Sequence, residues 1–167
     1  STSGRLFSQL LEYLGNEERK AIFIAATNNP EALDKDMIRS GRFDFVVPVL
    51  YPDEQARRQI LNIHTSVKRT LPINSFEKKE IENYIARETN LFSGADIEEL
   101  VLRAARKAFL DNTTDFVTLD HFIQAKNQFN INVEERSFRQ SEFENSATKI
   151  CSNTEFLDYQ RKEQIDQ

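Results

Sequence analysis

The sequence predicts an α/β fold over its first 50 residues and a small bundle of helices after them. Two observations support this prediction. Residues 21–26 form a short apolar run between polar turns, which is typical of a strand buried on both faces of a parallel sheet. No glycine or proline follows Gly94, so we expect the second half of the chain to be almost entirely helical, with polar turns between its helices.

The first third of the chain alternates between helix and strand patterns. The opening segment places apolar residues on one helical face, and Gly15-Asn16 is expected to end that helix as a C-terminal cap. A first strand over 21–26, a short helix over about 34–39 and a second strand over about 45–49 follow. The apolar face of the opening helix consists of Leu6, Phe7, Leu10, Leu11 and Leu14. The polar loop after the first strand lies at the end of a strand where ligands of open α/β sheets bind.

Four amphipathic helices are predicted between residues 53 and 130. Asp53 is placed as the N-cap of the first, whose inner face carries Ala56, Ile60, Leu61 and His64. The second begins near Asn74-Ser75, and the third begins with a capping box of the form S-x-x-D at Ser93 and Asp96. Thr118 caps the fourth. Four short helices with apolar faces make a small bundle.

Composition excludes several classes of protein. A net charge of −5 argues against a strongly basic nucleic-acid surface, and no apolar run reaches the roughly 20 residues of a membrane helix. The single cysteine, Cys151, excludes an internal disulfide and a cysteine-based zinc site, and it suits a reducing, cytoplasmic location. The only methionine is Met37, so we expect the chain to be a piece of a longer protein.

Three polar residues could act on a phosphate. Asn28 stands where the first predicted strand ends, and its amide can donate and accept hydrogen bonds, so it could hold a water molecule in line with a phosphate. An asparagine before Asn-Pro is also typical of a simple turn. Arg39 and Arg42 lie one helical turn apart, and clustered arginines can neutralise charge on a transferring phosphoryl group. The alternative for these two is a solvated salt-bridge pair.

Together, at this spacing, these residues resemble the second region of homology of the classical AAA ATPases. The resemblance covers roughly residues 1–130. It implies that Asn28 is sensor 1, and that Arg39 and Arg42 are arginine fingers that reach into the nucleotide site of the neighbouring subunit.

The downstream sequence is similar to the same family. His64 matches a lid histidine that looks toward the adenosine of the nucleotide, and Gly94-Ala95 match the sensor 2 region, where the backbone approaches adenine. Taken from the residues alone, His64 also fits a half-buried helix position, and Gly94 fits the first position of a helix.

The resemblance implies three parts. Residues 1–52 would be the C-terminal part of the large α/β subdomain of a AAA+ P-loop NTPase, residues 53–130 a four-helix lid, and residues 131–167 a polar tail. Sparse apolar groups at Phe143, Ala147, Ile150 and Cys151 suggest one further helix in that tail.

The resemblance also implies ATP hydrolysis with Mg²⁺ in a homo-oligomeric ring, expected to be a hexamer, that unfolds or remodels protein substrates. No nucleic-acid partner, membrane segment or protein-held metal site is expected. The 167 residues contain no G-x-x-x-x-G-K-[ST] loop and no credible Walker B strand, so an upstream segment would hold ATP and Mg²⁺, and the chain alone should be inactive. In the family's sheet the Walker A strand lies between the two strands predicted here. Both would therefore expose unpaired backbone edges.

The subfamily and two other functions stay open. Residues 41–44, Gly-Arg-Phe-Asp, resemble the valosin-type unfoldases, the proteasomal ATPases and FtsH, although Asn29 replaces an arginine common after sensor 1. FtsH would show H-E-x-x-H after the lid, whereas this chain has only His64 and His121. The alternatives are a non-hydrolysing interaction module on AAA rings and a part of a DNA-processing AAA+ machine, which usually has a different arginine-finger motif and more basic surfaces.

Overall fold

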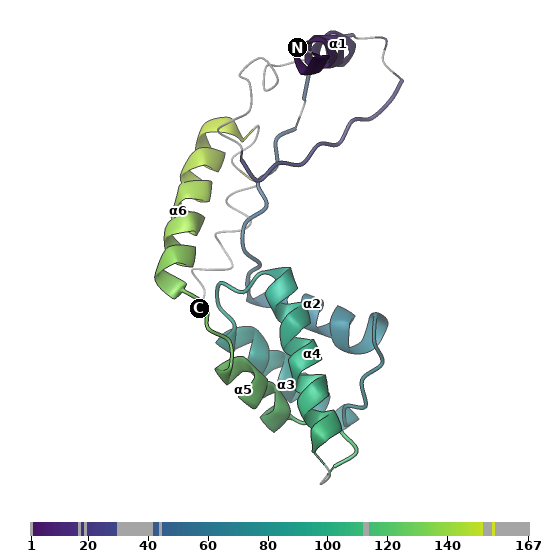
Figure 1. Ribbon diagram of the computed structural model, residues 1–167, viewed down its shortest axis with the longest axis vertical. Helices are drawn as coiled ribbons and strands as arrows, with labels where there is room; N and C mark the ends of the chain where they lie inside the picture. The colour runs from purple at the N-terminus through teal and green to yellow at the C-terminus, as the bar shows by residue number, and fades with distance from the viewer. Residues whose placement is uncertain are drawn as a thin grey trace. The chain divides into compact units, whose positions relative to one another are not determined.

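The computed structural model describes residues 2–16, 18, 20–29, 42–43, 45–111, 114–151 and 155. The chain divides into two compact units, Ser1–Val49 with Ser141–Arg161 and Leu50–Gln140 with Lys162–Gln167. The described elements, labelled in Figure 1, are α1 (Thr2–Leu14), α2 (Glu54–Asn62), the π-helix η2 (Ile63–Val67), α3 (Ser75–Glu88), α4 (Gly94–Leu110), α5 (Leu119–Asn127) and α6 (Val133–Ile150).

In the first unit, α1 forms and ends where the sequence predicts. The N–H of Gly15 donates to the carbonyl of Leu11 at 3.1 Å, which closes the last turn of the helix. Leu14 is buried, as expected for the apolar face. The ring of Tyr13 meets the ring of Phe23 edge-on, with centroids 5.3 Å apart, so the end of α1 packs on the segment that comes after it.

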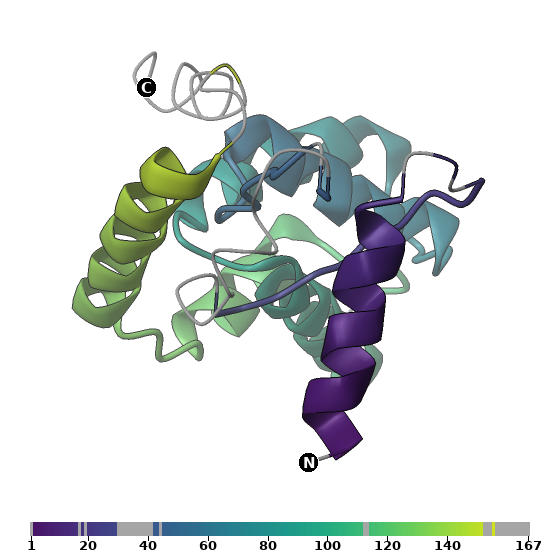
Figure 2. The ribbon, with the colours of Figure 1, turned by 90° about the horizontal axis from the view of Figure 1, so that it is seen from above.

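The two predicted strands do not form among the described residues, and this corrects the sequence prediction. Residues 21–26 and 45–49 belong to neither helix nor strand, and both are drawn as plain chain in Figure 2. Ile22 and Ile24 are 94% and 93% exposed rather than buried. The physical reason is that a strand satisfies its N–H and C=O groups on an adjacent strand, and the described part of the chain offers no such ladder. The short helix predicted at 34–39 lies outside the described residues.

The second unit contains the four predicted helices, and their caps follow the sequence closely. The Asp53 carboxylate accepts from the N–H of Ala56 at 2.6 Å, and the Asn74 side chain accepts from the N–H of Phe76 at 3.0 Å. Thr118 is the N-cap of α5. The helices share one core, which comprises Leu61, Ile81, Ile85, Ala86, Phe92, Ile97, Leu100, Val101, Ala104, Val117, Phe122 and Ala125.

Packing within this unit brings the start of α4 close to α2. Helix α4 packs against α2 and α5, and α3 packs against the same two helices, as the bundle in Figure 1 shows. A hydrogen bond from the N–H of Val117 to the carbonyl of Pro72, 2.8 Å long, joins the loop before α5 to the loop before α3. The candidate residues of the lid, His64 and Gly94, therefore belong to helices that pack around one core.

The predicted tail helix exists and is longer than its apolar residues suggested. Helix α6 begins at Val133, well before Phe143, and it runs unbroken to Ile150 (Figure 2). Ala147 is buried, and the thiol of Cys151 donates to the carbonyl of Val46 at 3.3 Å. Across the described residues, no helix combines the length and the apolar character that crossing a membrane requires.

Candidate functional site

The candidate site in the second unit begins at the N-terminus of α4. Ser93 and Asp96 form the predicted capping box: the Ser93 N–H donates to Oδ2 of Asp96 at 2.8 Å, and the Asp96 N–H donates to Oγ of Ser93 at 3.2 Å. Gly94 and Ala95 are the first two helical residues, and Ala95 is exposed. The first N–H groups of a helix have no partner within it, so this terminus can offer donors to a ligand.

Gly94 is not required by the packing of the chain. Among the described residues, a Cβ built at this position would meet only Cδ1 of Ile60, at 3.9 Å, which is an ordinary van der Waals contact. Glycine at a position that an alanine could occupy leaves room for another molecule to approach the backbone closely.

His64 lies in the π-helix at the end of α2 and is only 6% exposed. Nη1 of Arg69 lies 3.0 Å from its Nδ1, and because arginine only donates, Nδ1 accepts and the neutral ring carries its proton on Nε2. Burial lowers the pKa of His64 and outweighs the opposing effect of Glu98, while Lys68 and Arg69 lower this pKa further. His64 is therefore a neutral imidazole near pH 7.

The π-helix itself was not foreseen. The N–H of Lys68 donates to the carbonyl of Ile63, five residues back, at 2.8 Å, so the last turn of the first lid helix is wider than an α-turn. Such turns occur frequently at functional sites. The sequence places His64 correctly on the buried face, but the 3.6-residue period continues across this segment without a visible break.

Arg57 is a second feature that sequence reasoning missed. Its side chain is 3% exposed, with Nε donating to the carbonyl of Ala86 at 2.9 Å and Nη1 to the carbonyl of Pro52 at 2.7 Å. Burial lowers the pKa of Arg57, although Glu54 and Asp53 oppose this. The guanidinium ties the start of α2 to the end of α3, and no pattern in the sequence marks an arginine for that role.

The other candidate residues belong to the first unit. Asn28 is exposed at a bend, and the N–H of Asn29 donates to Oγ1 of Thr27 at 3.0 Å, as in a turn. Arg42 is half-buried, and Arg39 lies outside the described residues. In the described ranges, no cluster of three or more His, Cys, Asp or Glu residues could hold a metal ion.

Two family models match the sequence. Residues 1–51 match the model described as "ATPase family associated with various cellular activities (AAA)", and residues 82–124 match the "AAA+ lid domain". Together the two models cover more than half of the chain.

The chain is also similar in sequence to individual proteins. The chain is 38% identical to the "ATP-dependent zinc metalloprotease FtsH" of Buchnera aphidicola subsp. Schizaphis graminum, over 88% of this chain and 22% of that protein. It is 38% identical to the "ATP-dependent zinc metalloprotease YME1L1" of Mus musculus, over 81% of this chain and 18% of that one. The chain therefore spans about a fifth of the length of these relatives.

A solved structure shows the same fold. The crystal structure of the FIGL-1 AAA domain matches with a TM-score of 0.68 over 89% of this chain and 50% of that chain, at 22% sequence identity. The fold is thus the C-terminal part of a AAA+ large subdomain followed by a helical lid, with a partly helical tail.

Proposed function

Because this chain belongs to the AAA ATPase family, we propose that it supplies the sensor 1, arginine-finger and lid parts of an ATP-hydrolysing module that works as a hexameric ring on protein substrates. The relatives named above are ATP-dependent proteases, which supports hydrolysis coupled to work on proteins. The phosphate-binding loop and the Walker B acid occur nowhere in the 167 residues. This chain, preceded by a segment that carries both motifs, is termed the complete module.

The observation that carries the proposal is the setting of Gly94. This residue begins a capped helix, the first N–H groups of a helix have no partner within it, and neighbouring described side chains would tolerate a Cβ. A glycine with no packing role at a helix N-terminus would allow a flat ligand to lie against the backbone. We propose that this ligand is the adenine of ATP, seated on Gly94-Ala95.

His64 would complete the adenosine end of the site. Its Nδ1 is occupied by Arg69, and no hydrogen-bond partner for Nε2 occurs among the described residues. A neutral ring with a fixed tautomer presents one N–H donor in one direction, which suits recognition of an uncharged nucleoside better than a mobile cation would.

The residues present fit the adenosine end of ATP and not its phosphate end, because the chain holds no glycine-rich loop of N–H groups and no lysine after one. When bound, ATP with Mg²⁺ supplies the phosphoryl group that hydrolysis transfers. Asn28 would hold the attacking water, while Arg39 and Arg42 would neutralise charge in the site of the adjacent subunit. On this account residues 1–167 alone show no ATPase activity.

Substitution of Gly94 tests the proposal. In the complete module, Gly94→Ala should weaken ATP binding about tenfold, a loss of about 1.4 kcal/mol, while the melting temperature stays the same or rises slightly, because alanine suits a helix better than glycine. Titration calorimetry measures the affinity. Gly15→Ala is the matched control: Gly15 belongs to the first unit, and among the described residues a Cβ there would meet only backbone oxygens of α1, at 3.5 and 3.7 Å. Unchanged ATP affinity in Gly94→Ala would contradict the proposed seat of adenine.

A further inference from the structure

The turn that leads into α4 has an unfavourable backbone conformation. Leu91 has φ 60°, in the left-handed region that residues with a Cβ rarely adopt. Its N–H is held by Oδ1 of Asn90 at 3.0 Å, and its side chain is buried. Such a conformation persists only where surrounding contacts fix it, so the contacts around this turn decide how the start of α4 is presented.

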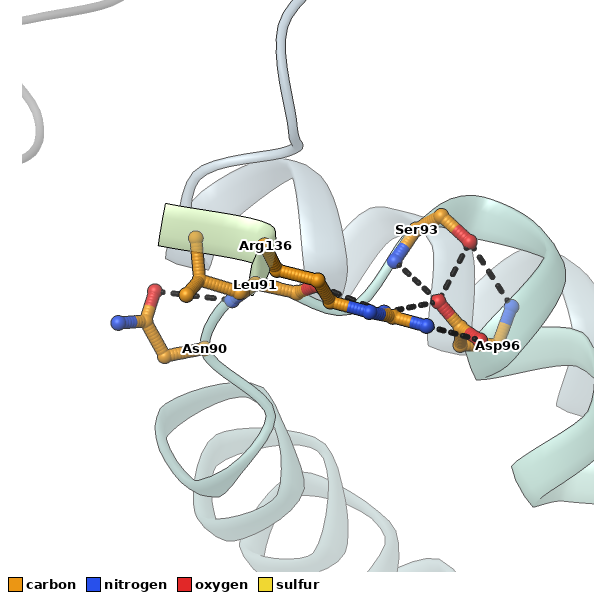
Figure 3. Close-up of polar contacts among 5 residues, drawn as sticks. All are labelled: Asn90, Leu91, Ser93, Asp96 and Arg136. Carbon is orange, nitrogen blue, oxygen red and sulfur yellow. Dashed lines mark hydrogen bonds and ion pairs between the residues drawn. The ribbon is translucent and has the colours of Figure 1, made fainter. Parts of the chain in front are cut away.

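Arg136 makes those contacts from a distant part of the sequence (Figure 3). Its Nη1 donates to the carbonyl of Leu91 at 2.9 Å and to Oδ2 of Asp96 at 2.6 Å, while Nη2 donates to Oδ1 of Asp96 at 3.2 Å. The guanidinium thus bridges the two residues that flank the Phe92–Ala95 segment. A forked arginine–carboxylate pair of this kind fixes both distance and orientation.

The electrostatics show a stable ion pair. Burial disfavours the charge on Asp96, but hydrogen bonds from Arg136 and Ser93 outweigh it and lower the pKa of Asp96. The hydrogen bond to Asp96 raises the pKa of Arg136. Both groups therefore keep their charges throughout the neutral range.

The start of α6 presents Arg136 to the turn. The N–H of Arg136 donates to the carbonyl of Asn132 at 3.0 Å, and Oδ1 of Asn132 accepts from the N–H of Glu135 at 3.1 Å, so the first turn of α6 is well formed. The guanidinium also lies 6.0 Å from the ring centroid of Tyr51. A capping box needs only its serine and its acid to satisfy the helix N-terminus, so the arginine is an addition that the cap does not require.

We propose that Arg136 is a positioning residue for nucleotide binding: by joining Leu91 to Asp96, it holds the backbone of Gly94-Ala95 in the one conformation that accepts adenine. This inference rests on the proposed function of Gly94. It assigns a role in the site to α6, a helix outside the four of the lid.

The experiment compares two ligands in the complete module. ATP carries adenine, whereas inorganic tripolyphosphate carries only the phosphates that the P-loop would hold. Arg136→Gln should raise the Kd for ATP about tenfold, because apparent affinity falls with the fraction of molecules whose site is competent, and it should leave the Kd for tripolyphosphate unchanged. Arg139→Gln is the matched control on the same helix, since Arg139 is exposed and pairs with Glu135 of that helix; it should change neither affinity.

Two further variants separate the outcomes. Arg136→Lys keeps the charge but not the fork, so it should recover part of the ATP affinity. If Arg136→Gln fails to fold, Asp96→Asn removes the charge of the partner while keeping an oxygen for the cap, and it should show the same selective loss for ATP. An equal loss for both ligands would overturn the inference, as would unchanged ATP affinity where Gly94→Ala weakens it. If Gly94→Ala also has no effect, the proposed function fails and the inference falls with it.

Discussion

The lid and the segments before it both contain apolar residues, but these residues are buried in the lid and exposed in the segment that contains Ile22 and Ile24. Ile97, Leu100 and Val101 are fully buried in α4, whereas Ile22 and Ile24 stand almost fully exposed. A helix satisfies its backbone within itself, so its apolar face needs only another helix to pack on. A strand needs a hydrogen-bonded neighbour before it can be buried. The lid helices therefore find their packing partners within the lid, whereas the predicted strands need a pairing partner that the described residues do not supply.

Hydrogen exchange should show the largest contrast between the two regions. Amides in the middle of α4 exchange only when the lid opens, so we expect them to be protected by about 10³-fold or more, given an ordinary domain stability of about 5 kcal/mol. Amides of residues 21–26 should exchange at nearly unprotected rates. Mass spectrometry of peptides from residues 1–167 makes the measurement. Strong protection over 21–26 would show that these residues find a partner within the chain.

Truncating one side chain in each region should change the free energy of unfolding by different amounts. Leu100→Ala should cost about 2–5 kcal/mol in the free energy of unfolding, as a large-to-small change at a fully buried position. Ile24→Ala should cost less than about 0.5 kcal/mol, as a substitution on an exposed surface. Urea denaturation followed by circular dichroism compares both variants with the parent chain. Equal costs would remove the distinction between the regions.

The buried arginine of the lid provides a polar test of the same packing. Arg57→Met should cost about 1–3 kcal/mol, because the carbonyls of Ala86 and Pro52 each lose the hydrogen bond from the guanidinium. Arg58, its neighbour in α2, forms a partly exposed i,i+4 pair with Glu54. Arg58→Met should cost about 1 kcal/mol or less. If both variants unfold at the same urea concentration, the hydrogen bonds of Arg57 contribute little to the stability of the lid.

His64 should give the stability of the lid a small pH dependence. Its pKa is lowered in the folded lid relative to its ordinary value of 6.5, so below about pH 6.5 the unfolded chain binds more protons and the lid loses stability as the pH falls. Above that pH this contribution is fully present. His64→Gln should flatten the slope between about pH 5 and 7, measured as the difference from the parent chain by thermal melts. Parallel curves would mean that His64 titrates alike in both states.

Local chemistry made part of this structure predictable. Asp53, Ser93 and Thr118 correctly predict three helix starts, because an N-cap side chain bonds to a backbone N–H only two or three positions away. A helical face is also set by residues only three or four positions apart, so the apolar faces, including the one that carries His64, could be assigned from spacing. Gly94 and Ala95 fall where the pattern places them, at the first turn of α4.

The remaining features depend on contacts between distant residues. The apolar runs predict strands, but the composition of a run does not show which other strand it would pair with. Arg57 donates to the carbonyl of Ala86, 29 residues away, and Arg136 donates to the carbonyl of Leu91, 45 residues away. A single sequence does not indicate contacts at such separations. The π-helix after α2 is only five residues long, which is too short for periodicity to distinguish it from an α-helix.

Mixed rings test the proposal that this chain supplies arginines to the nucleotide site of a neighbouring subunit. Two variants of the complete module are prepared, Arg39→Ala and one in which the P-loop lysine is replaced. Each variant alone should fold normally but lose ATPase turnover. An arginine finger can contribute on the order of 10³–10⁵ in rate. In mixed rings some interfaces pair an intact P-loop with an intact neighbouring arginine, so part of the ATPase activity should return. If affinity-tagged rings contain both variants and no activity returns, Arg39 does not act across the subunit boundary, and its proposed role as an arginine finger is wrong.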